Sequence, residues 1–225
     1  MSKKSFIDDG FNPELVQGAE FDGILEIPII PPPPNTRIPT GLTPFSMRSR
    51  ITCETEGLCF YENDPLFADV IIHPEHYLDE FRKYYAVLTP DCSMYRDAPL
   101  LVQIGNQYKR QALGYYFWKH GTYVIPTVRW GDERTYSKTV LPEAVSFLGI
   151  PKHSIVSIGT YGCVQSKENR YLFQAGLAAM FENLAPNLVL VYGPKPKGMF
   201  EPYENYVKLT FYPNWIKRVR RGKNG

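Results

Sequence analysis

The sequence predicts an α/β fold with a mostly parallel sheet made of repeated strand–helix units, and two observations support it. Short apolar runs begin near residues 57, 86, 123, 154 and 188, so successive runs start 29, 37, 31 and 34 residues apart. This is the period of a strand–helix–strand unit. The runs at 155–158 and 188–192 are apolar without alternation, which is typical of strands covered on both faces. The spacing fits both a partial TIM-like barrel and a doubly wound sheet.

Helices are expected between these runs. We predict one over 66–84 with Pro74 opening its main segment, one over 100–119, a short one over 142–148, and one from Ser166 to about 184. A further strand is expected over 206–211. Pro126 interrupts the run at 123–128, and because proline donates no hydrogen bond to a ladder it predicts a bulge or bend there.

The predicted helix over 100–119 has two different faces. Its apolar stripe, which we expect to face the core, comprises Leu101, Ile104, Tyr108, Ala112 and Tyr115. The opposite face carries Gln103, Asn106, Gln107 and Arg110. We interpret this second face as solvated, while amides beside an arginine also suit a binding surface.

Composition divides the chain into three segments. Residues 1–50 contain four successive prolines and no clear period, and their apolar side chains indicate an extended arm that lies over the core or over a second subunit. Residues 51–213 form the α/β domain. Residues 214–225 form a basic tail that suits nucleic acid phosphates and equally suits a solvated terminus.

Size and charge narrow the class of protein. The chain has 225 residues and a formal charge of +2, which fits one domain with no strong global field. Its four cysteines, including Cys53 and Cys92, form no CxxC pair, which favours a reducing compartment. Asp8 and Asp9 interrupt any signal sequence, and no apolar run is long enough to span a bilayer. We expect a soluble protein of the cytoplasm with no membrane partner.

In parallel α/β folds the functional site lies beyond the C-terminal ends of the strands. Asp91 follows the second run in Thr89-Pro90-Asp91, where a carboxylate suits a general base or metal ligand and equally suits a turn cap. Arg129 and Trp130 follow the third run and suit phosphate binding and base stacking, while Trp130 also suits the core.

Other candidates are weaker. Thr160 lies between two glycines after the fourth run, in a segment that matches neither phosphate-binding fingerprint. His73 and His76 are three residues apart without further ligands at a diagnostic spacing, so we interpret them as surface histidines and assign no metal ligand. Cys92 has no identifiable histidine partner, which argues against a thiol nucleophile.

Several motifs together resemble a known family. They include Thr89-Pro90-Asp91 with Ser93 and Tyr95, Gln103 with Asn106 and Arg110, 124–127 with Trp130, 157–160 and 191–193. Over about residues 10–195 the chain resembles a domain family of unknown function found in Firmicutes, their phages and other mobile elements. The resemblance implies a phage or mobile-element setting in a bacterial host cell. It marks as motif positions Asp91, Ser93, Asn106, Arg110, Thr127, Trp130 and Tyr192. The family usually has an aromatic residue at position 92, which further weakens a catalytic Cys92.

Three hypotheses for function follow. The first is an enzyme acting on a nucleotide or nucleic acid, with Asp91 as catalytic base or ligand of a divalent metal. Its ligand-binding residues are Ser93, Asn106, Arg110, Thr127, Arg129, Trp130, Thr160 and Tyr192. The second is a non-catalytic protein that engages a host factor or sequesters a small ligand. The third is an assembly protein that oligomerises through its N-terminal arm.

Overall fold

A computed structural model describes residues 12–50 and 54–222, and its core consists of seven parallel strands. They form a four-stranded and a three-stranded sheet. In order, the strands are β3 (Leu42–Pro44), β4 (Gly57–Cys59), β5 (Ala86–Leu88), β6 (Val124–Ile125), β7 (Ile155–Gly159), β8 (Leu188–Tyr192) and β9 (Lys208–Tyr212). The predicted parallel α/β fold is confirmed. Predictions that concern Asp8, Asp9 and Cys53 lie outside the described residues.

The two sheets meet just after β6. Thr127 forms a parallel bridge with Ser157, and the Val128 amide donates to the Ser157 carbonyl at 2.8 Å. The Ser157 amide donates in turn to the carbonyl of Pro126 at 2.9 Å. The strands therefore follow one another in space in chain order, as in a barrel, and not in the reversing order of a doubly wound sheet.

The barrel is open between β9 and β3, since no ladder joins these two strands in the described part of the chain. Their ends nevertheless approach each other. The Tyr212 hydroxyl donates to the carbonyl of Pro39 at 2.7 Å, just before β3 begins. The region where β9 and the helix α6 (Trp215–Gly222) lie close to β3 and β4 is called the seam below.

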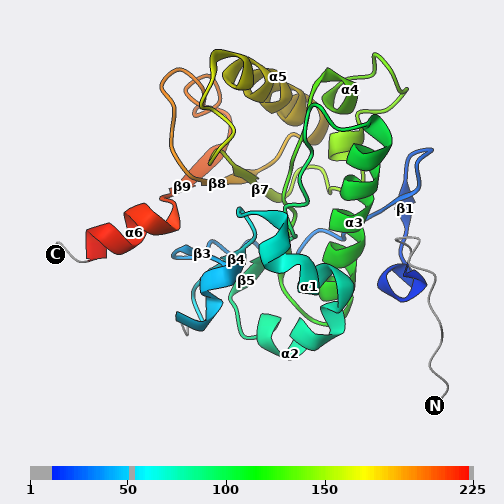
Figure 1. Ribbon diagram of the computed structural model, residues 1–225, viewed down its shortest axis with the longest axis vertical. Coiled ribbons are helices and arrows are strands. Elements are labelled where there is room, and N and C mark those ends of the chain that lie inside the picture. The colour runs from blue at the N-terminus through cyan, green and yellow to red at the C-terminus, as the bar shows by residue number, and fades with distance from the viewer. Residues whose placement is uncertain (1–11, 51–53, 223–225) are drawn as a thin grey trace.

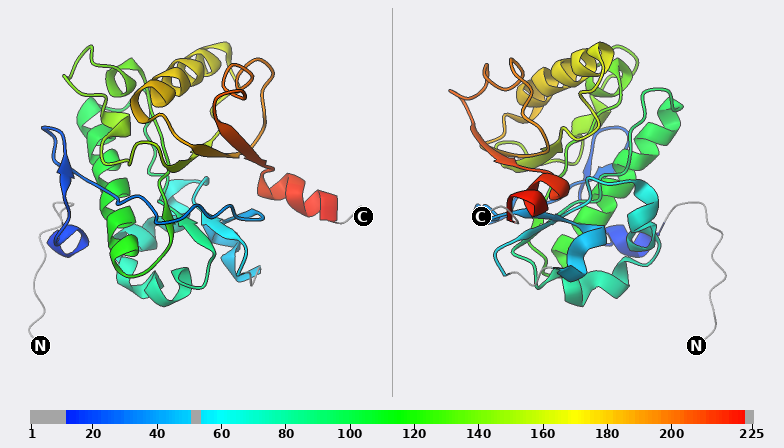
Figure 2. Two further views of the ribbon diagram at one scale, coloured as in Figure 1. Left: turned by 180° about the vertical axis from the view of Figure 1, so that it is seen from behind. Right: turned by 60° about the vertical axis from the view of Figure 1, so that its left-hand side comes forward.

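Helices cover the outside of the strands (Figures 1 and 2). The long helix α3 (Leu100–Lys119) and a series of short helices lie against the first sheet, and α5 (Lys167–Leu184) lies against the second. The short helices between β4 and β5 are η3 (Asp64–Phe67), α1 (Ala68–Ile72), η4 (Pro74–Tyr77) and α2 (Leu78–Phe81). The others are η1 (Pro13–Val16), η2 (Phe45–Arg50), α4 (Glu133–Tyr136), η5 (Val145–Phe147) and α6 (Trp215–Gly222).

The helix predicted over 66–84 is therefore broken into four short pieces. Pro74 opens η4, as expected of a first-turn proline. The preceding residue, His73, has φ −130° and ψ 57°, because a residue before proline is pushed out of the helical region. None of the helices in the described ranges is both long enough and apolar enough to cross a membrane.

Side chains from the strands fill three cores. Every strand from β3 to β9 contributes side chains to the inner core. The alternate residues of each strand point outward instead. The buried members of the inner core are Leu42, Cys59, Tyr61, Ala86, Leu88, Ile125, Ile155, Leu188, Leu190, Tyr192 and Tyr212. Outward residues pack under the helices instead, such as Val87 beneath α3 and Val189 beneath α5. The strands from β3 to β8 are thus covered on both faces, whereas β9 is buried only at Tyr212.

The long helix α3 reverses the expected polarity at several positions. Leu101, predicted to face the core, is 78% exposed. Three residues of the face expected to be solvated, Gln103, Gln107 and Arg110, are fully buried. Loops cover this face, because Gln103 donates to the carbonyl of Ala98 and Gln107 to that of Leu148.

The N-terminal segment forms a short hairpin of β1 (Phe21–Asp22) and β2 (Ile27–Pro28) before it enters the sheet as β3. Ile27 is buried, whereas Phe21 and Ile24 are 47% and 69% exposed on this chain. Since β3 lies inside the segment 1–50, the part of it that follows the hairpin contributes directly to the barrel.

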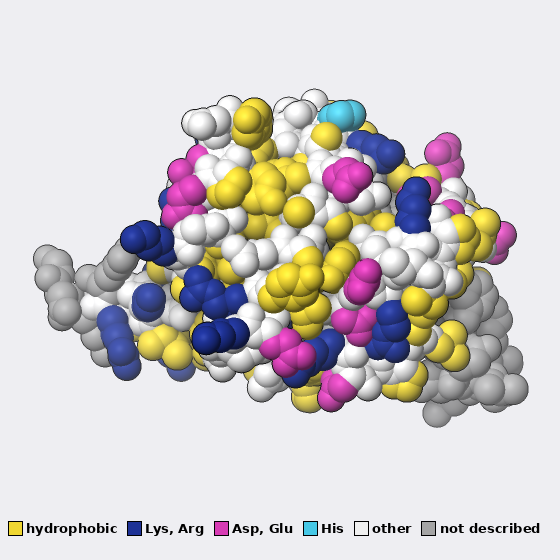
Figure 3. Space-filling model, turned by 90° about the horizontal axis from the view of Figure 1, so that it is seen from above, with side chains coloured by type: hydrophobic (Ala, Val, Ile, Leu, Met, Phe, Trp, Pro, Cys, Tyr) yellow, Lys and Arg dark blue, Asp and Glu magenta, His cyan; other side chains and the backbone are white. Residues whose placement is uncertain are grey.

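Within the basic tail, residues 215–222 fold as α6, which closes the seam. Arg218 binds both carboxylate oxygens of the buried Glu56, and its Nη1 lies 2.7 Å from Oε2. Burial raises the pKa of Glu56, but hydrogen bonds from Arg218 and Thr43 and the charge of Arg218 outweigh it. The pKa of Glu56 therefore lies below its usual 4.5. Lys and Arg side chains gather at the end of the molecule that carries α6 (Figure 3).

Two glycines of α3 provide a matched test of this packing. A Cβ at Gly114 would lie 2.4 Å from Ile30 Cδ1 and 2.6 Å from Thr89 Cγ2, whereas a Cβ at Gly105 has no neighbour within 4 Å. We expect Gly114→Ala to destabilise the fold by about 1–3 kcal/mol through overpacking. Gly105→Ala should stabilise the same helix by about 0.5–1 kcal/mol. Urea unfolding measures both, and equal effects would contradict the close approach of α3 to β5.

The Glu56–Arg218 pair predicts a pH-dependent stability. We expect Glu56→Gln to destabilise the protein at pH 7 by about 2 kcal/mol, less than a fully buried pair because Arg218 is 30% exposed. Because the pKa of Glu56 is lower in the folded state than in the unfolded state, ionised Glu56 stabilises the fold above pH 4.5. This stabilisation is lost as the pH falls from 4.5 through the folded-state pKa. The difference between wild type and variant in urea unfolding should therefore shrink below pH 4.5, and a constant difference would contradict the pairing.

Candidate functional site

A pocket of about 430 Å³ opens at the C-terminal ends of the central strands. Its walls are formed by the segments that follow β4, β5, β6 and β7 and by the first turns of α5. Among its lining residues are Tyr61, Asp91, Ser93, Tyr95, Arg96, Arg129, Trp130, Tyr161, Cys163, Asn169 and Phe173. The volume lies within the range of roughly 300–1,000 Å³ that ligand pockets occupy.

Asp91 lies in the loop after β5 and is 6% exposed. Its Oδ2 lies 3.4 Å from Nη1 of Arg129, which follows β6. Its Oδ1 is enclosed and has no hydrogen-bond partner within the described residues. A buried carboxylate oxygen normally accepts at least one hydrogen bond, so Oδ1 is an unfilled acceptor on a residue that lines the pocket.

Burial disfavours the charged form of both Asp91 and Arg129. It raises the pKa of Asp91, and although Arg129 and Arg110 act in the opposite direction, the pKa stays above its usual value. Burial lowers the pKa of Arg129, but the charge of Asp91 and further contributions from Cys163 and Tyr61 together outweigh burial, so this pKa is raised. Burial, and then the nearby Asp91, raise the pKa of Tyr61. A raised pKa brings a carboxylate closer to the range in which general acids and bases work.

Three residues hold the loop that carries Asp91. Asp64 accepts hydrogen bonds from the Ser93 amide at 3.0 Å and from the Ser93 hydroxyl at 2.6 Å. Asn106 of α3 donates to the Ser93 carbonyl at 2.6 Å. Arg110 donates to the carbonyl of Cys92 at 2.7 Å. Of the predicted ligand-binding residues, Ser93 therefore lines the pocket, while Asn106 and Arg110 support the loop from behind.

Arg129 and Trp130 lie together in the wall after β6. Arg129 Nη1 also contacts Cys163 Sγ at 3.1 Å. The Trp130 ring packs against Phe173 at a centroid distance of 5.1 Å. A Cβ at Gly176 of α5 would lie 2.3 Å from Trp130 Nε1, so one face of the indole is fixed in the core. Trp130 thus belongs both to the pocket wall and to the core beneath α5.

Three further predicted residues lie outside the pocket lining. Thr127 donates through its hydroxyl to the carbonyl of Thr89 at 2.8 Å, and Thr160 donates to that of Pro194 at 2.7 Å. Tyr192 stacks on Tyr61 at 5.3 Å. Their contacts connect strands and position the pocket wall.

The structure adds residues that the sequence analysis did not assign to the site. Tyr95 and Tyr161 are 61% and 50% exposed at the pocket. Arg96 forms a 2.7 Å ion pair with Glu168 of α5 beside it. Tyr95 belongs to a quoted motif and Tyr161 follows a strand, which were the available signals. Asn169 and Phe173 had none, because they lie on α5, whose first turns form part of the wall, and not at a strand end.

The groups next to Asp91 are poorly suited to act as a thiolate nucleophile or as further metal ligands. Burial raises the pKa of Cys92 to about 12, which opposes formation of a thiolate. Both oxygens of the neighbouring Asp64 accept hydrogen bonds from Ser93. Within the described residues, the lone cluster of three potential metal ligands lies elsewhere, at His73, Glu75 and His76.

The buried Arg110 generates a prediction about the loop. Arg110→Met leaves the Cys92 carbonyl and the Gln107 side-chain oxygen without their donor, so we expect a loss of about 3 kcal/mol in folding stability. Lys109→Met on the same helix, which is partly exposed, should change stability by less than about 0.5 kcal/mol. Thermal unfolding compares the two, and a neutral Arg110→Met variant would remove the proposed support of the Asp91 loop.

Fold and pocket together define an α/β protein with an open parallel barrel and a ligand-sized pocket at its C-terminal strand ends. The chain belongs to the family described as Domain of unknown function (DUF4417), whose model matches residues 19–212.

Two relatives are phage gene products. The chain is 33% identical over 191 residues to the "Gene 1 protein" of Mycobacterium phage D29, covering 84% of this chain and 67% of the relative. It is 32% identical over 163 residues to the "Gene 1 protein" of Mycobacterium phage L5, covering 71% and 68%. No solved structure matches the chain. The expected relation to an uncharacterised, phage-associated family is confirmed.

Proposed function

We propose that this phage-related protein binds a nucleotide unit in the strand-end pocket, either free or at the end of a nucleic acid strand. The observation that carries the proposal is the enclosed, unpartnered Oδ1 of Asp91 beside Arg129 in a pocket of ligand size. A buried carboxylate oxygen without a donor costs folding free energy, which ligand binding offsets if the ligand supplies an N–H or O–H group. Amino groups of bases and hydroxyls of ribose are such donors.

The remaining pocket chemistry matches the other parts of a nucleotide. Arg129 contacts Asp91 and Cys163 through Nη1, and a guanidinium carries five donors in a fork that fits phosphate. Tyr95 and Tyr161 expose ring surface at the pocket, which suits stacking on a base. Asp91, with its raised pKa, is also placed to exchange a proton with a bound group.

The proposal keeps the setting expected from the sequence, the cytoplasm of a bacterial host. It assigns Asp91, Arg129 and Ser93 to the pocket. It gives Asn106, Arg110, Thr127, Thr160 and Tyr192 positioning roles. Trp130 contributes one edge of its ring to the wall, and the base stacks on the tyrosines.

Calorimetric titration of the full chain tests the proposal. The probes are the four ribonucleoside monophosphates, their triphosphates, a short single-stranded DNA and inorganic phosphate. We expect at least one nucleotide or the oligonucleotide to bind more tightly than phosphate. Asp91→Asn and Arg129→Gln should each weaken it about 10- to 100-fold, the range for hydrogen bonds to charged groups. Chromatography of the recovered ligand then distinguishes turnover from simple binding.

Asp79→Asn is the matched control, because it removes the same charge from an exposed residue of α2 away from the pocket. It should bind like the wild type. Thermal unfolding of the Asp91→Asn variant checks that it is folded. This check is needed because Asp91 is buried, so its substitution can also affect stability. Binding of no probe at about 1 mM, or unchanged binding by both pocket variants, would refute the proposal.

A further inference from the structure

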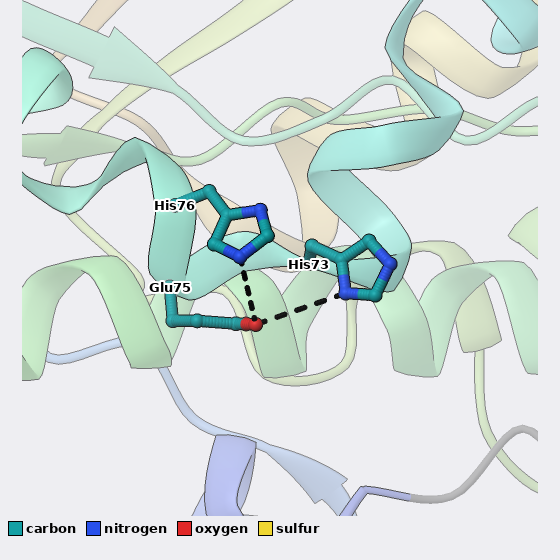
Figure 4. Close-up of side chains that lie close together, drawn as sticks. All are labelled: His73, Glu75 and His76. Carbon is teal, nitrogen blue, oxygen red and sulfur yellow. Dashed lines mark ion pairs between the residues drawn. The ribbon is translucent and has the colours of Figure 1, made fainter.

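Three ligand-type side chains converge on the surface between α1 and η4. His73 Nδ1 and His76 Nε2 each lie 3.7 Å from Glu75 Oε1. One potential ligand atom from each residue lies within 4.8 Å of the other two. Figure 4 shows the two imidazole rings next to each other, with a dashed line from each ring to the same oxygen of Glu75. None of the three residues lines the strand-end pocket.

The backbone holds these side chains together. The His73 amide closes α1 by donating to Asp69 at 2.7 Å, and the His76 amide donates to the His73 carbonyl at 3.1 Å. Pro74, between them, is buried and fixes the first residue of η4. The imidazole rings stack with centroids 5.1 Å apart and planes 23° apart. The turn therefore brings the ligand atoms close before any ion binds.

We propose that His73, Glu75 and His76 form a binding site for a divalent transition-metal ion of the zinc class. Zinc binds histidine nitrogen and carboxylate oxygen at about 2.0–2.2 Å, which places tetrahedral ligand atoms about 3.4 Å apart. The two 3.7 Å separations from Glu75 need a contraction of a few tenths of an ångström. The ligand atoms of the two histidines lie within 4.8 Å of each other and approach further by rotation of their exposed side chains. Two imidazoles and one carboxylate favour such ions over magnesium or calcium. Water completes the coordination.

The three side chains of the cluster are too exposed for their ion pairs to stabilise the fold much by themselves, whereas their exposure leaves them accessible to a metal ion. The side chains of His73, Glu75 and His76 are 49%, 53% and 63% exposed, and exposed ion pairs contribute little to stability. A bound ion would connect the end of α1 to η4. It would then stabilise the folded chain in proportion to the logarithm of its concentration.

Titration of the untagged full chain with zinc chloride at about pH 7.5 tests the site. We expect one ion per chain with an affinity on the order of micromolar. His73→Asn and His76→Asn should each weaken binding at least tenfold. His153→Asn is the matched control, because His153 is exposed and its φ of 53° suits asparagine. It should bind zinc like the wild type.

Cobalt provides a second readout, since its visible absorption reports the coordination geometry. Affinity should fall as pH is lowered from 7.5 to 5.5, because imidazole binds metal only after losing its proton. Absence of binding at about 1 mM zinc, or equal binding by the His73→Asn/His76→Asn double variant, would overturn the proposal. Neither measurement involves the strand-end pocket, so the result is independent of the nucleotide proposal.

Discussion

The architecture depends on how the chain passes Thr127. Pairing of β6 with β5 ends at Ile125, and the Thr127 amide then donates at 2.9 Å to the side chain of Thr89 on β5's extension. The same residue bridges Ser157, so three strands meet at one position. Asp91 and Arg129 each lie two residues beyond a member of the Thr89–Thr127 contact. This contact therefore sets the spacing of the charged pair in the pocket.

A second constraint comes from the buried polar face of α3. Arg110 and Asn106 bind carbonyls of the loop that carries Asp91, so the helix replaces apolar contact with hydrogen bonds at this place. The loop has irregular backbone and needs donors for its carbonyls, which side-chain amides and a guanidinium supply. A helix with an apolar inner face would leave those carbonyls unsatisfied.

The sequence predicted the parts whose signal is local. The runs predicted at 155–158 and 188–192 and the helix predicted from Ser166 to about 184 have continuous or periodic signals, and they match β7, β8 and α5. The general position of the pocket followed from strand direction alone. The orientation of α3 did not follow, because hydrophobic patterning places Leu101 inside and Gln107 outside. Strand β3 was hidden by Pro39 shortly before it and by Pro44 at its own end. The contact of Glu56 with Arg218 joins residues 162 positions apart.

The open seam has a consequence for how the chain folds. Neighbouring strands are consecutive in sequence, so each closes a loop of moderate length as the sheet grows. The Tyr212–Pro39 and Arg218–Glu56 contacts instead close loops of 173 and 162 residues. Such contacts carry the largest entropic cost of closure and form after the intervening strands are ordered. We therefore expect the contacts of the seam to form late in folding. Contacts that form late slow unfolding more than they speed folding.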